Sequence, residues 1–275
     1  MSLPTTIVFR HSIATRVLHW LNAVCVFLVL MSGLQIFNAH PRLYWGQYGA
    51  NTDHAALEMT VGGPAKGQSL GIVRVGHYEI PTTGFLGVSK DRGGDLIERG
   101  FPSWATIPSY QDLATGRRWH FFFAWVLVFS SGLYFLIGFA ARHIQRDLLP
   151  TRTQWSFNSI GRDIWNHLRL RFPTGEAARQ YSSLQKLAYL AVLFILAPMI
   201  LATGLTMSPG LDAGFPWLLN LFGGRQSART LHFICATMVV LFIVMHLAMV
   251  VLAGPLNELR SMITGRYVLP PENLK

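Results

Sequence analysis

The chain has 275 residues, of which 51% are hydrophobic and only 13% are charged. Soluble domains average about 25% charged residues, so this composition favours an integral membrane protein. The formal net charge of +10 does not indicate nucleic-acid binding, because no basic run alternates with aromatic residues that could stack on bases; an excess of Lys and Arg is instead typical of the cytoplasmic loops of membrane proteins.

Four apolar stretches are each long enough to cross a bilayer, which takes about 20 residues. The first is too long for the apolar part of a cleavable signal peptide, and no small-residue cleavage site follows it. Pro198 lies inside the third stretch and should kink that helix. The expected fold class is an all-α membrane protein, a four-transmembrane-helix bundle that forms one domain over residues 1–275. Its spans are expected at residues 17–37, 119–141, 184–207 and 228–253.

The connecting loops differ in length and charge. Loop 38–118 is long, whereas loop 142–183 contains seven Arg residues and loop 208–227 contains one. The positive-inside rule applies to short loops, so it places loop 142–183 in the cytoplasm. With four spans, both termini are then cytoplasmic and loop 38–118 is periplasmic, in the inner (cytoplasmic) membrane of a bacterium.

Three weaker segments lie outside the spans. Residues 157–168 carry apolar side chains on one helical stripe, which predicts an amphipathic helix on the inner leaflet. Gly71–Val75 and His77–Ile80 resemble two strands of a small hairpin. Phe215–Phe222 is apolar but too short to span, and we expect it to dip into the outer interface.

Four of the ten histidines fall inside or at the start of the spans, where ionisable residues are functional candidates. His246 follows His232 by fourteen residues, so the two project from nearly the same helix face, about 21 Å apart along the axis. The topology places His19 level with His246 near the inner surface, and His120 level with His232 near the outer surface. We therefore expect two haems held by the pairs His19/His246 and His120/His232, although a lone histidine in a span is more often a packed residue.

Other residues leave alternatives open. His143, at the inner end of the second span, could replace His19 as a ligand. His54 and His77 are loop residues that are either solvated or face a partner or quinone. Cys25 and Cys235 lie in apolar stretches without metal-binding spacing, so we expect small buried side chains and no zinc or iron–sulfur site.

Basic and small residues accompany the histidines. Arg16, Arg118 and Arg229 precede them and could bind haem propionates, or could snorkel to the interface. Gly33 follows His19 by fourteen residues, and Gly132 follows His120 by twelve. A residue without a side chain leaves room for a flat macrocycle, or allows close helix packing.

Residues 16–33 (RVLHWLNAVCVFLVLMSG) resemble the first helix of the b-type cytochrome subunits of respiratory oxidoreductases. This family includes nickel–iron hydrogenase cytochrome b, the formate dehydrogenase gamma subunit and thiosulfate reductase cytochrome b, and is related to bacterial cytochrome b561. The stretches 116–134, 184–209 and 223–255 resemble its other helices, and the last holds both histidines at the family's spacing. Loop 38–118 is much longer than in the hydrogenase and formate dehydrogenase subunits.

The resemblance implies an electron-transfer subunit with two haem b groups ligated by the four histidines. It further implies exchange of electrons with a quinone near the inner haem and with a periplasmic redox subunit, a molybdopterin or iron–sulfur protein. Bis-histidine ligation leaves no open iron position for substrate chemistry. A homodimer is left open. Tyr181, Gln185 and Lys186, at the inner end of the third span, could hydrogen-bond a quinone carbonyl, or could simply anchor the helix at the interface.

Two rival functions use the same fold. A stand-alone superoxide:quinone oxidoreductase of the cytochrome b561 type would need no partner, and a positive outer funnel would favour it. A non-redox transporter or membrane anchor would contain no haem, but transporters usually show internal repeats and this sequence has none.

Overall fold

The computed structural model describes residues 6–62, 70–91, 93–142, 144–169, 171 and 181–269. The chain divides into two compact units, each of which is treated by itself below. The first unit comprises Met1–Leu21, Ser130–Pro198 and Thr237–Lys275, and the second comprises Asn22–Phe129 and Met199–Ala236. All four of the long helical segments contribute residues to both units.

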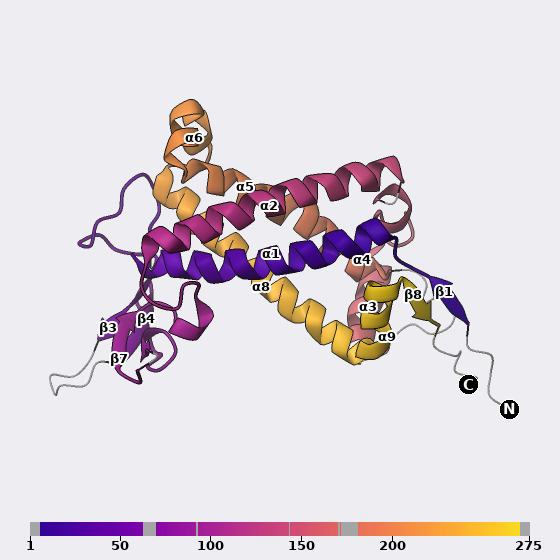
Figure 1. Ribbon diagram of the computed structural model, residues 1–275, viewed down its shortest axis with the longest axis horizontal. Coiled ribbons are helices and arrows are strands. Elements are labelled where there is room, and N and C mark those ends of the chain that lie inside the picture. Colours follow the sequence, from indigo (N-terminus) through magenta and orange to yellow (C-terminus); the bar gives the residue numbers. More distant parts are fainter. Residues whose placement is uncertain are drawn as a thin grey trace. The chain divides into compact units, whose positions relative to one another are not determined.

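Four helical segments in the described part of the chain are long and apolar enough to cross a membrane. Only 6–17% of the residues in their most apolar windows are buried within the protein, which suits helices whose side chains face lipid. Helices satisfy their own backbone groups, as a bilayer requires. The four stretches expected to span are confirmed as long apolar helices, with starts up to six residues earlier than expected. They are α1 (Ile13–Asn38), α2 (Leu113–Ala140), Ser183–Thr206 and α8 (Arg225–Ala253), shown in Figure 1.

The third span is built from α4 (Ser183–Ala191), a π-helical turn η4 (Val192–Leu196) and α5 (Ala197–Thr206). The π turn ends two residues before Pro198, which has no backbone N–H to donate to the preceding turn. Such wider turns are a usual form of helix irregularity. The backbone is therefore irregular where the proline predicts a kink.

The first unit holds the two ends of the described chain together. Strand β1 (Ile7–Phe9) pairs antiparallel with β8 (Arg266–Val268), as Figure 1 shows. Helix α9 (Pro255–Thr264) leads into β8 and ends at Gly265, whose φ of 80° is the left-handed conformation that glycine adopts readily at helix ends. Both ends thus lie on one side of the unit.

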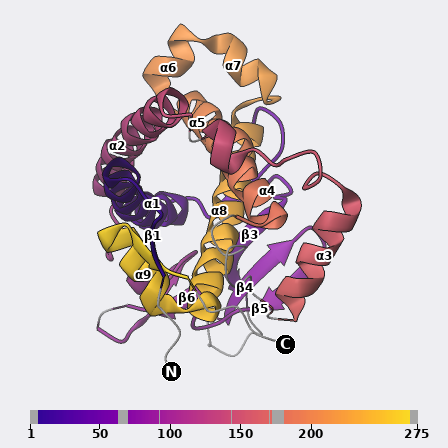
Figure 2. The ribbon, with the colours of Figure 1, turned by 90° about the vertical axis from the view of Figure 1, so that its right-hand side faces the viewer.

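Helix α3 (Phe157–Leu168) follows the π-helical turn η2 (Ile144–Leu148) and lies beside α4 (Figure 2). The Ser183 N–H donates to Asp163 Oδ2 at 2.8 Å, and the hydroxyls of Ser159 and Ser183 are 3.1 Å apart. The expected helix at 157–168 is confirmed with the same bounds, and Phe157 is 93% exposed on it. Its place on the inner leaflet stays a prediction.

The second unit contains the strands of segment 38–118, so an all-α description of the chain is incomplete. The predicted hairpin is confirmed as the antiparallel pair β4–β5, but it is part of a larger sheet.

A separate two-stranded sheet and three short helices complete the unit. The larger sheet, in order, is β2 (Arg42–Leu43), β3 (Leu57–Gly62), β4 (Leu70–Val75) and β5 (Tyr78–Pro81). The other elements are β6 (Gly87–Lys90), β7 (Leu96–Arg99), η1 (Ser103–Ala105), α6 (Pro209–Gly214) and α7 (Pro216–Leu221).

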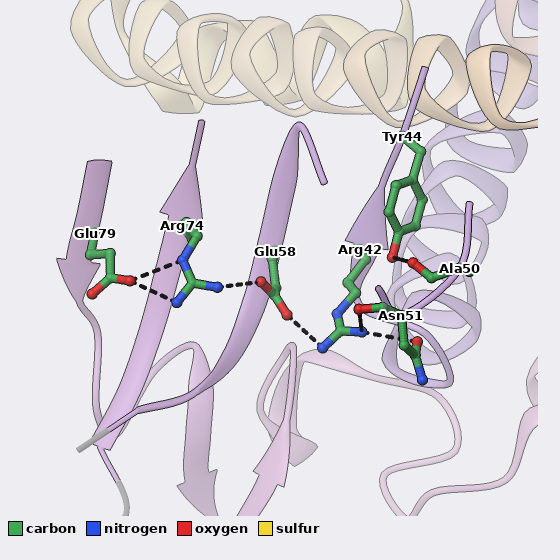
Figure 3. A network of polar contacts seen from close by, with 7 residues as sticks. All are labelled: Arg42, Tyr44, Ala50, Asn51, Glu58, Arg74 and Glu79. Carbon is green, nitrogen blue, oxygen red and sulfur yellow. Dashed lines mark hydrogen bonds and ion pairs between the residues drawn. The ribbon is translucent and has the colours of Figure 1, made fainter. Parts of the chain in front are cut away.

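An ion-pair ladder crosses the larger sheet (Figure 3). Glu58 accepts from Arg42 at 2.6 Å and from Arg74 at 2.7 Å, and Arg74 also pairs with Glu79 at 2.6 Å. The ladder joins β2, β3, β4 and β5 side by side, and Arg42 also bonds Asn51 Oδ1 at 2.9 Å. Opposite charges on neighbouring strands favour this register.

A small apolar core fastens the larger sheet to the helices of the second unit. Phe37 of α1 stacks on Phe233 of α8 with ring centroids 4.8 Å apart, and Met59 of β3 is buried in the same cluster. Asn38 exchanges two hydrogen bonds with the backbone of Phe101, at 2.6 and 3.1 Å. Described residues of segment 38–118 therefore pack against the end of α1 and against α8 within the second unit.

Candidate functional site

Two pairs of histidines face each other, one pair in each unit. The ring centroids of His19 and His246 are 6.4 Å apart in the first unit, and those of His120 and His232 are 6.3 Å apart in the second. Two metal–imidazole bonds of about 2 Å each, plus the two ring radii, give a centroid separation of about 6 Å. Both pairs therefore have the spacing of two axial ligands with one metal ion between them.

The ligand sets differ from those of other metal sites. No group of three or more His, Cys, Asp or Glu side chains that could hold a metal ion occurs among the residues that the structure describes. Cys25 and Cys235 are free and buried, as the sequence predicts. Two facing imidazoles alone suit a metal whose remaining ligands come from a macrocycle.

His120 is held by α1. Its Nδ1 lies 3.0 Å from the carbonyl oxygen of Val29 and 3.4 Å from Ser32 Oγ. A Cβ on Gly33 would meet His120 Cε1 at 3.2 Å. Gly33 therefore leaves room for the imidazole ring of His120. The sequence alone had suggested room for a macrocycle or close helix packing at this glycine.

His232 is held by α5 in the same manner. Its Nδ1 lies 3.1 Å from the carbonyl oxygen of Ile200 and 3.1 Å from Thr203 Oγ1. A Cβ on Gly204 would meet His232 Cε1 at 3.4 Å. The sequence reasoning missed Ser32, Thr203 and Gly204, although Ser-Gly at 32–33 and Thr-Gly at 203–204 recur as a visible dipeptide pattern.

The histidines of the first unit have a different environment. His19 Nδ1 is buried and has no hydrogen-bond partner. Buried polar atoms almost always have a partner, so a group bound beside this ring would account for the exception. The His246 ring stacks on Phe242 at 5.9 Å, and Phe242 contacts Tyr189 at 6.2 Å.

The three arginines suggested as propionate ligands occupy different settings. Arg16 donates to the carbonyl oxygen of Ile263 and is thus engaged with α9. Arg229 is half-buried, donates to the carbonyl oxygen of His40 at 2.5 Å and lies over the Phe37 ring. Arg118 is exposed at the start of α2.

The three residues suggested for quinone binding are mostly occupied in supporting the fold. Gln185 completes a capping box with Ser182 at the start of α4. Lys186 is buried and its Nζ lies 3.2 Å from Gln154 Oε1. Tyr181 lies under the Arg10 guanidinium at 5.4 Å; burial raises the pKa of its phenol, and the positive charge of Arg10 opposes that shift.

The first unit contains a cavity of about 380 Å³. Leu18, the residue next to His19, lines it, together with Tyr134 from α2. Most of its remaining lining is polar. These polar residues include Arg10, His11, Ser12, Thr15, Arg146 and Asp147.

Arg99 is a buried cation in the second unit that the sequence reasoning did not single out. Its guanidinium donates to the Ser109 carbonyl oxygen at 2.9 Å, to Thr106 Oγ1 at 3.0 Å and to Gln35 Oε1 at 3.2 Å. Burial lowers the pKa of this guanidinium. Since Gln35 lies on α1 two residues after Gly33, Arg99 links segment 38–118 to the helix turn that holds His120.

His143, the alternative ligand to His19, lies outside the described residues. His54 and His77 are exposed residues of segment 38–118 and belong to neither of the histidine pairs described above.

Two of three comparisons with known proteins found a match. A family model for prokaryotic cytochrome b561 matches residues 10–265, a range that contains the four long helical segments and the four paired histidines. A putative protein-methionine-sulfoxide reductase subunit, YedZ1, from Azospira oryzae is 24% identical over 250 residues, which are 91% of this chain and 93% of that protein. No solved structure matches the chain.

Proposed function

Since the chain belongs to the prokaryotic cytochrome b561 family, we propose that it carries two haems and passes electrons between a quinone pool and a partner oxidoreductase. Membership of the family makes it a membrane electron-transfer protein and implies haem b as its cofactor. The observation that carries the two-haem proposal is the presence of two histidine pairs with centroid separations of 6.3 and 6.4 Å.

His19 and His246 would hold one haem, and His120 and His232 the other. When bound, each haem would supply a one-electron iron couple, and ligation by two histidines would leave no iron position for substrate. The protein's part is to hold the imidazoles in facing pairs. Because α8 carries one histidine of each pair, a single helix serves both sites.

Two further residues are proposed to surround the haems. Arg118 is exposed two residues before His120 and is free to reach a propionate, which a guanidinium binds bidentately. Arg229 reaches the His40 carbonyl and would contribute a nearby positive charge. Arg16 is the weakest of the three candidates because α9 already engages it.

We place the quinone in the cavity beside Leu18 rather than on Gln185 and Lys186, whose side chains are occupied in the fold. A volume of about 380 Å³ lies within the range of small-molecule sites, about 300–1,000 Å³. Reduction of a quinone to a quinol takes two electrons and two protons. Thr15, Tyr134, His11 and Asp147 all line the cavity; the Thr15 and Tyr134 hydroxyls would donate hydrogen bonds to the quinone carbonyl oxygens, and His11 and Asp147 would exchange the protons.

The orientation we propose follows from charge. The pairing of β1 with β8 places both described ends of the chain on one side, as an even number of spans requires. With four spans, loop 142–183 lies on the same side as the two ends. This loop carries seven Arg residues, so the side that it shares with the ends is cytoplasmic. Segment 38–118 then faces the periplasm of a bacterial inner membrane.

Segment 38–118 is our candidate docking surface for the partner. Its exposed aromatic residues include Tyr48, Tyr78 and Trp104, which are 84%, 79% and 68% exposed, and aromatic side chains are enriched in protein interfaces. The family resemblance favours a periplasmic molybdopterin-dependent partner. The description of the Azospira relative favours one that reduces protein methionine sulfoxide, in which two electrons and two protons convert the sulfoxide to a thioether and water.

The test is a reduced-minus-oxidised optical spectrum with haem quantitation on the purified protein and on His246→Ala. Two haem b groups per chain, falling to one in the variant, are expected. Purified protein without haem would overturn the electron-transfer proposal and return the histidines to packing. One haem in the unmodified protein would refute one of the two pairs.

A further inference from the structure

We propose that Ser32 and Thr203 are positioning residues that fix the tautomer of His120 and His232 and tune the redox potential of the haem between them. The inference rests on the proposed haem ligation by this pair. It comes from two groups of residues of the same construction, which we call sockets: a hydroxyl residue, the carbonyl three residues before it, and the glycine that follows it.

The α1 socket determines where the His120 proton lies. Ser32 Oγ is 2.6 Å from the carbonyl oxygen of Leu28, which can only accept, so the hydroxyl proton is committed to that bond. The oxygen that faces His120 Nδ1 at 3.4 Å is then an acceptor, and so is the Val29 carbonyl at 3.0 Å. Nδ1 must therefore carry the proton, which leaves the Nε2 lone pair for a metal.

The α5 socket repeats this logic with the same sequence offsets. Thr203 Oγ1 donates to the carbonyl oxygen four residues earlier, that of Met199, at 2.6 Å. It thereby accepts from His232 Nδ1 at 3.1 Å, alongside the Ile200 carbonyl at 3.1 Å. Ser32 and Thr203 are both completely buried, at 0% exposure, so water does not compete for these bonds.

The two glycines complete the sockets by letting the rings approach. A Cβ at Gly33 or Gly204 would lie 3.2 or 3.4 Å from the facing Cε1 atom. The hydroxyl and the glycine are adjacent in sequence, so they stand on one turn of helix and meet the same ring. The same combination of hydroxyl, carbonyl and glycine thus occurs on α1 and on α5, beside the two histidines of one pair. This repetition indicates that both ligands of that site need the same hydrogen bonds.

The sockets have a chemical consequence for the bound metal. A second acceptor on the far nitrogen makes an imidazole ligand more basic, which favours the more oxidised metal. Both ligands of the second unit have two acceptors, whereas His19 Nδ1 in the first unit has none. Removal of one hydroxyl should thus raise the midpoint potential of the His120/His232 haem alone.

The experiment measures midpoint potentials by optical redox titration and records ferric low-spin electron paramagnetic resonance spectra. Ser32→Ala and Thr203→Val are made in the unmodified protein and in His246→Ala, which should retain only the haem of interest. Ser32→Thr and Thr203→Ser test rescue by the conservative hydroxyl. Thr206→Val is the matched control, because Thr206 is buried on the same helix and its hydroxyl donates to the Thr203 carbonyl oxygen at 2.6 Å.

We expect both hydroxyl-removing variants to raise the same one of the two potentials and to alter the same resonance signal. The conservative variants should return both readouts toward the unmodified values, and Thr206→Val should leave them unchanged. Two bound haems with unaltered potentials and spectra in Ser32→Ala and Thr203→Val would overturn the inference and leave the proposed function standing. Absence of haem from the unmodified protein would instead refute the proposed function.

Discussion

The imidazole rings of His19 and His246 lie 6.4 Å apart, although these residues belong to the first and the last of the long helices. His19 Nδ1 is buried there without a partner, while the His246 ring is backed by Phe242 at 5.9 Å. The pair is thus aligned by apolar packing, and the pair in the second unit is aligned by hydrogen bonds.

The pairing itself can be tested by comparing four alanine variants. His19→Ala and His246→Ala should each leave one haem per chain, with the same midpoint potential in both. His120→Ala and His232→Ala should likewise leave one haem, with a different potential shared by those two. Haem quantitation and redox titration provide the measurement, and any other grouping of the four variants would mean that the ligands pair differently.

Gly33→Ala should weaken haem retention because its Cβ would press on His120 Cε1 at 3.2 Å. We expect a loss of one haem, or its release at a temperature several degrees lower, followed by absorbance during heating. Gly161→Ala is the control, since nothing lies within 4 Å of a Cβ at that position of α3 and alanine stabilises a helix by up to about 1 kcal/mol relative to glycine. Equal haem loss in both variants would remove the special role of Gly33.

Tyr134→Phe tests the quinone cavity. Loss of one hydrogen bond worth about 1 kcal/mol should raise KM for a soluble quinol analogue roughly fivefold, with both haems retained. Gln185→Leu, in the capping box of α4, should leave KM unchanged. Steady-state reduction of the haems by the quinol measures both, and the reverse result would return the site to the end of α4.

Arg99→Leu should destabilise segment 38–118, because three acceptors would lose a buried charged donor. Hydrogen bonds to charged groups contribute about 1.5–3 kcal/mol each when broken, so a marked fall in thermal unfolding temperature in detergent is expected. Arg74→Leu removes ion pairs from a more exposed side chain, which typically contribute at most about 1 kcal/mol. A larger effect of Arg74→Leu would contradict this ranking.

Tyr78→Cys tests the orientation. Tyr78 is 79% exposed at the start of β5, whereas the native Cys25 and Cys235 are buried. A membrane-impermeant maleimide should label the variant in cells with a permeabilised outer membrane. A cysteine at Arg152, in the loop assigned to the cytoplasm, should be labelled only after the inner membrane is opened.

The positions of the long helices, and the level of each histidine along them, could be predicted from the sequence for a physical reason. A bilayer demands long apolar runs, so the spans are visible in composition, and helical rise fixes which histidines can meet. His19 with His246, and His120 with His232, are brought together as those arguments predict.

The strands of segment 38–118 and the hydrogen bonds of the histidines were harder to predict from the sequence. Only the β4–β5 pair was expected. The β2–β3 pairing joins strands that no tight turn connects, and β6–β7 was missed although Gly93-Gly94 between those strands is a turn signal. Ser32 and Thr203 look like ordinary small residues of a membrane helix until the partner ring is placed beside them. Side-chain contacts between distant helices have no local signature in sequence.

Helix α9 connects the end of the chain to the helix turn that carries His19. The carbonyl oxygens of Met262 and Ile263, at its last turn, accept from Trp20 and Arg16, the neighbours of His19 in sequence. During synthesis α1 is made first, and these bonds form only after α9 has been made. The turn of α1 that carries His19 therefore gains these two hydrogen bonds only after all four long helical segments exist, and a variant truncated before Pro255 would have α1 in the membrane without them.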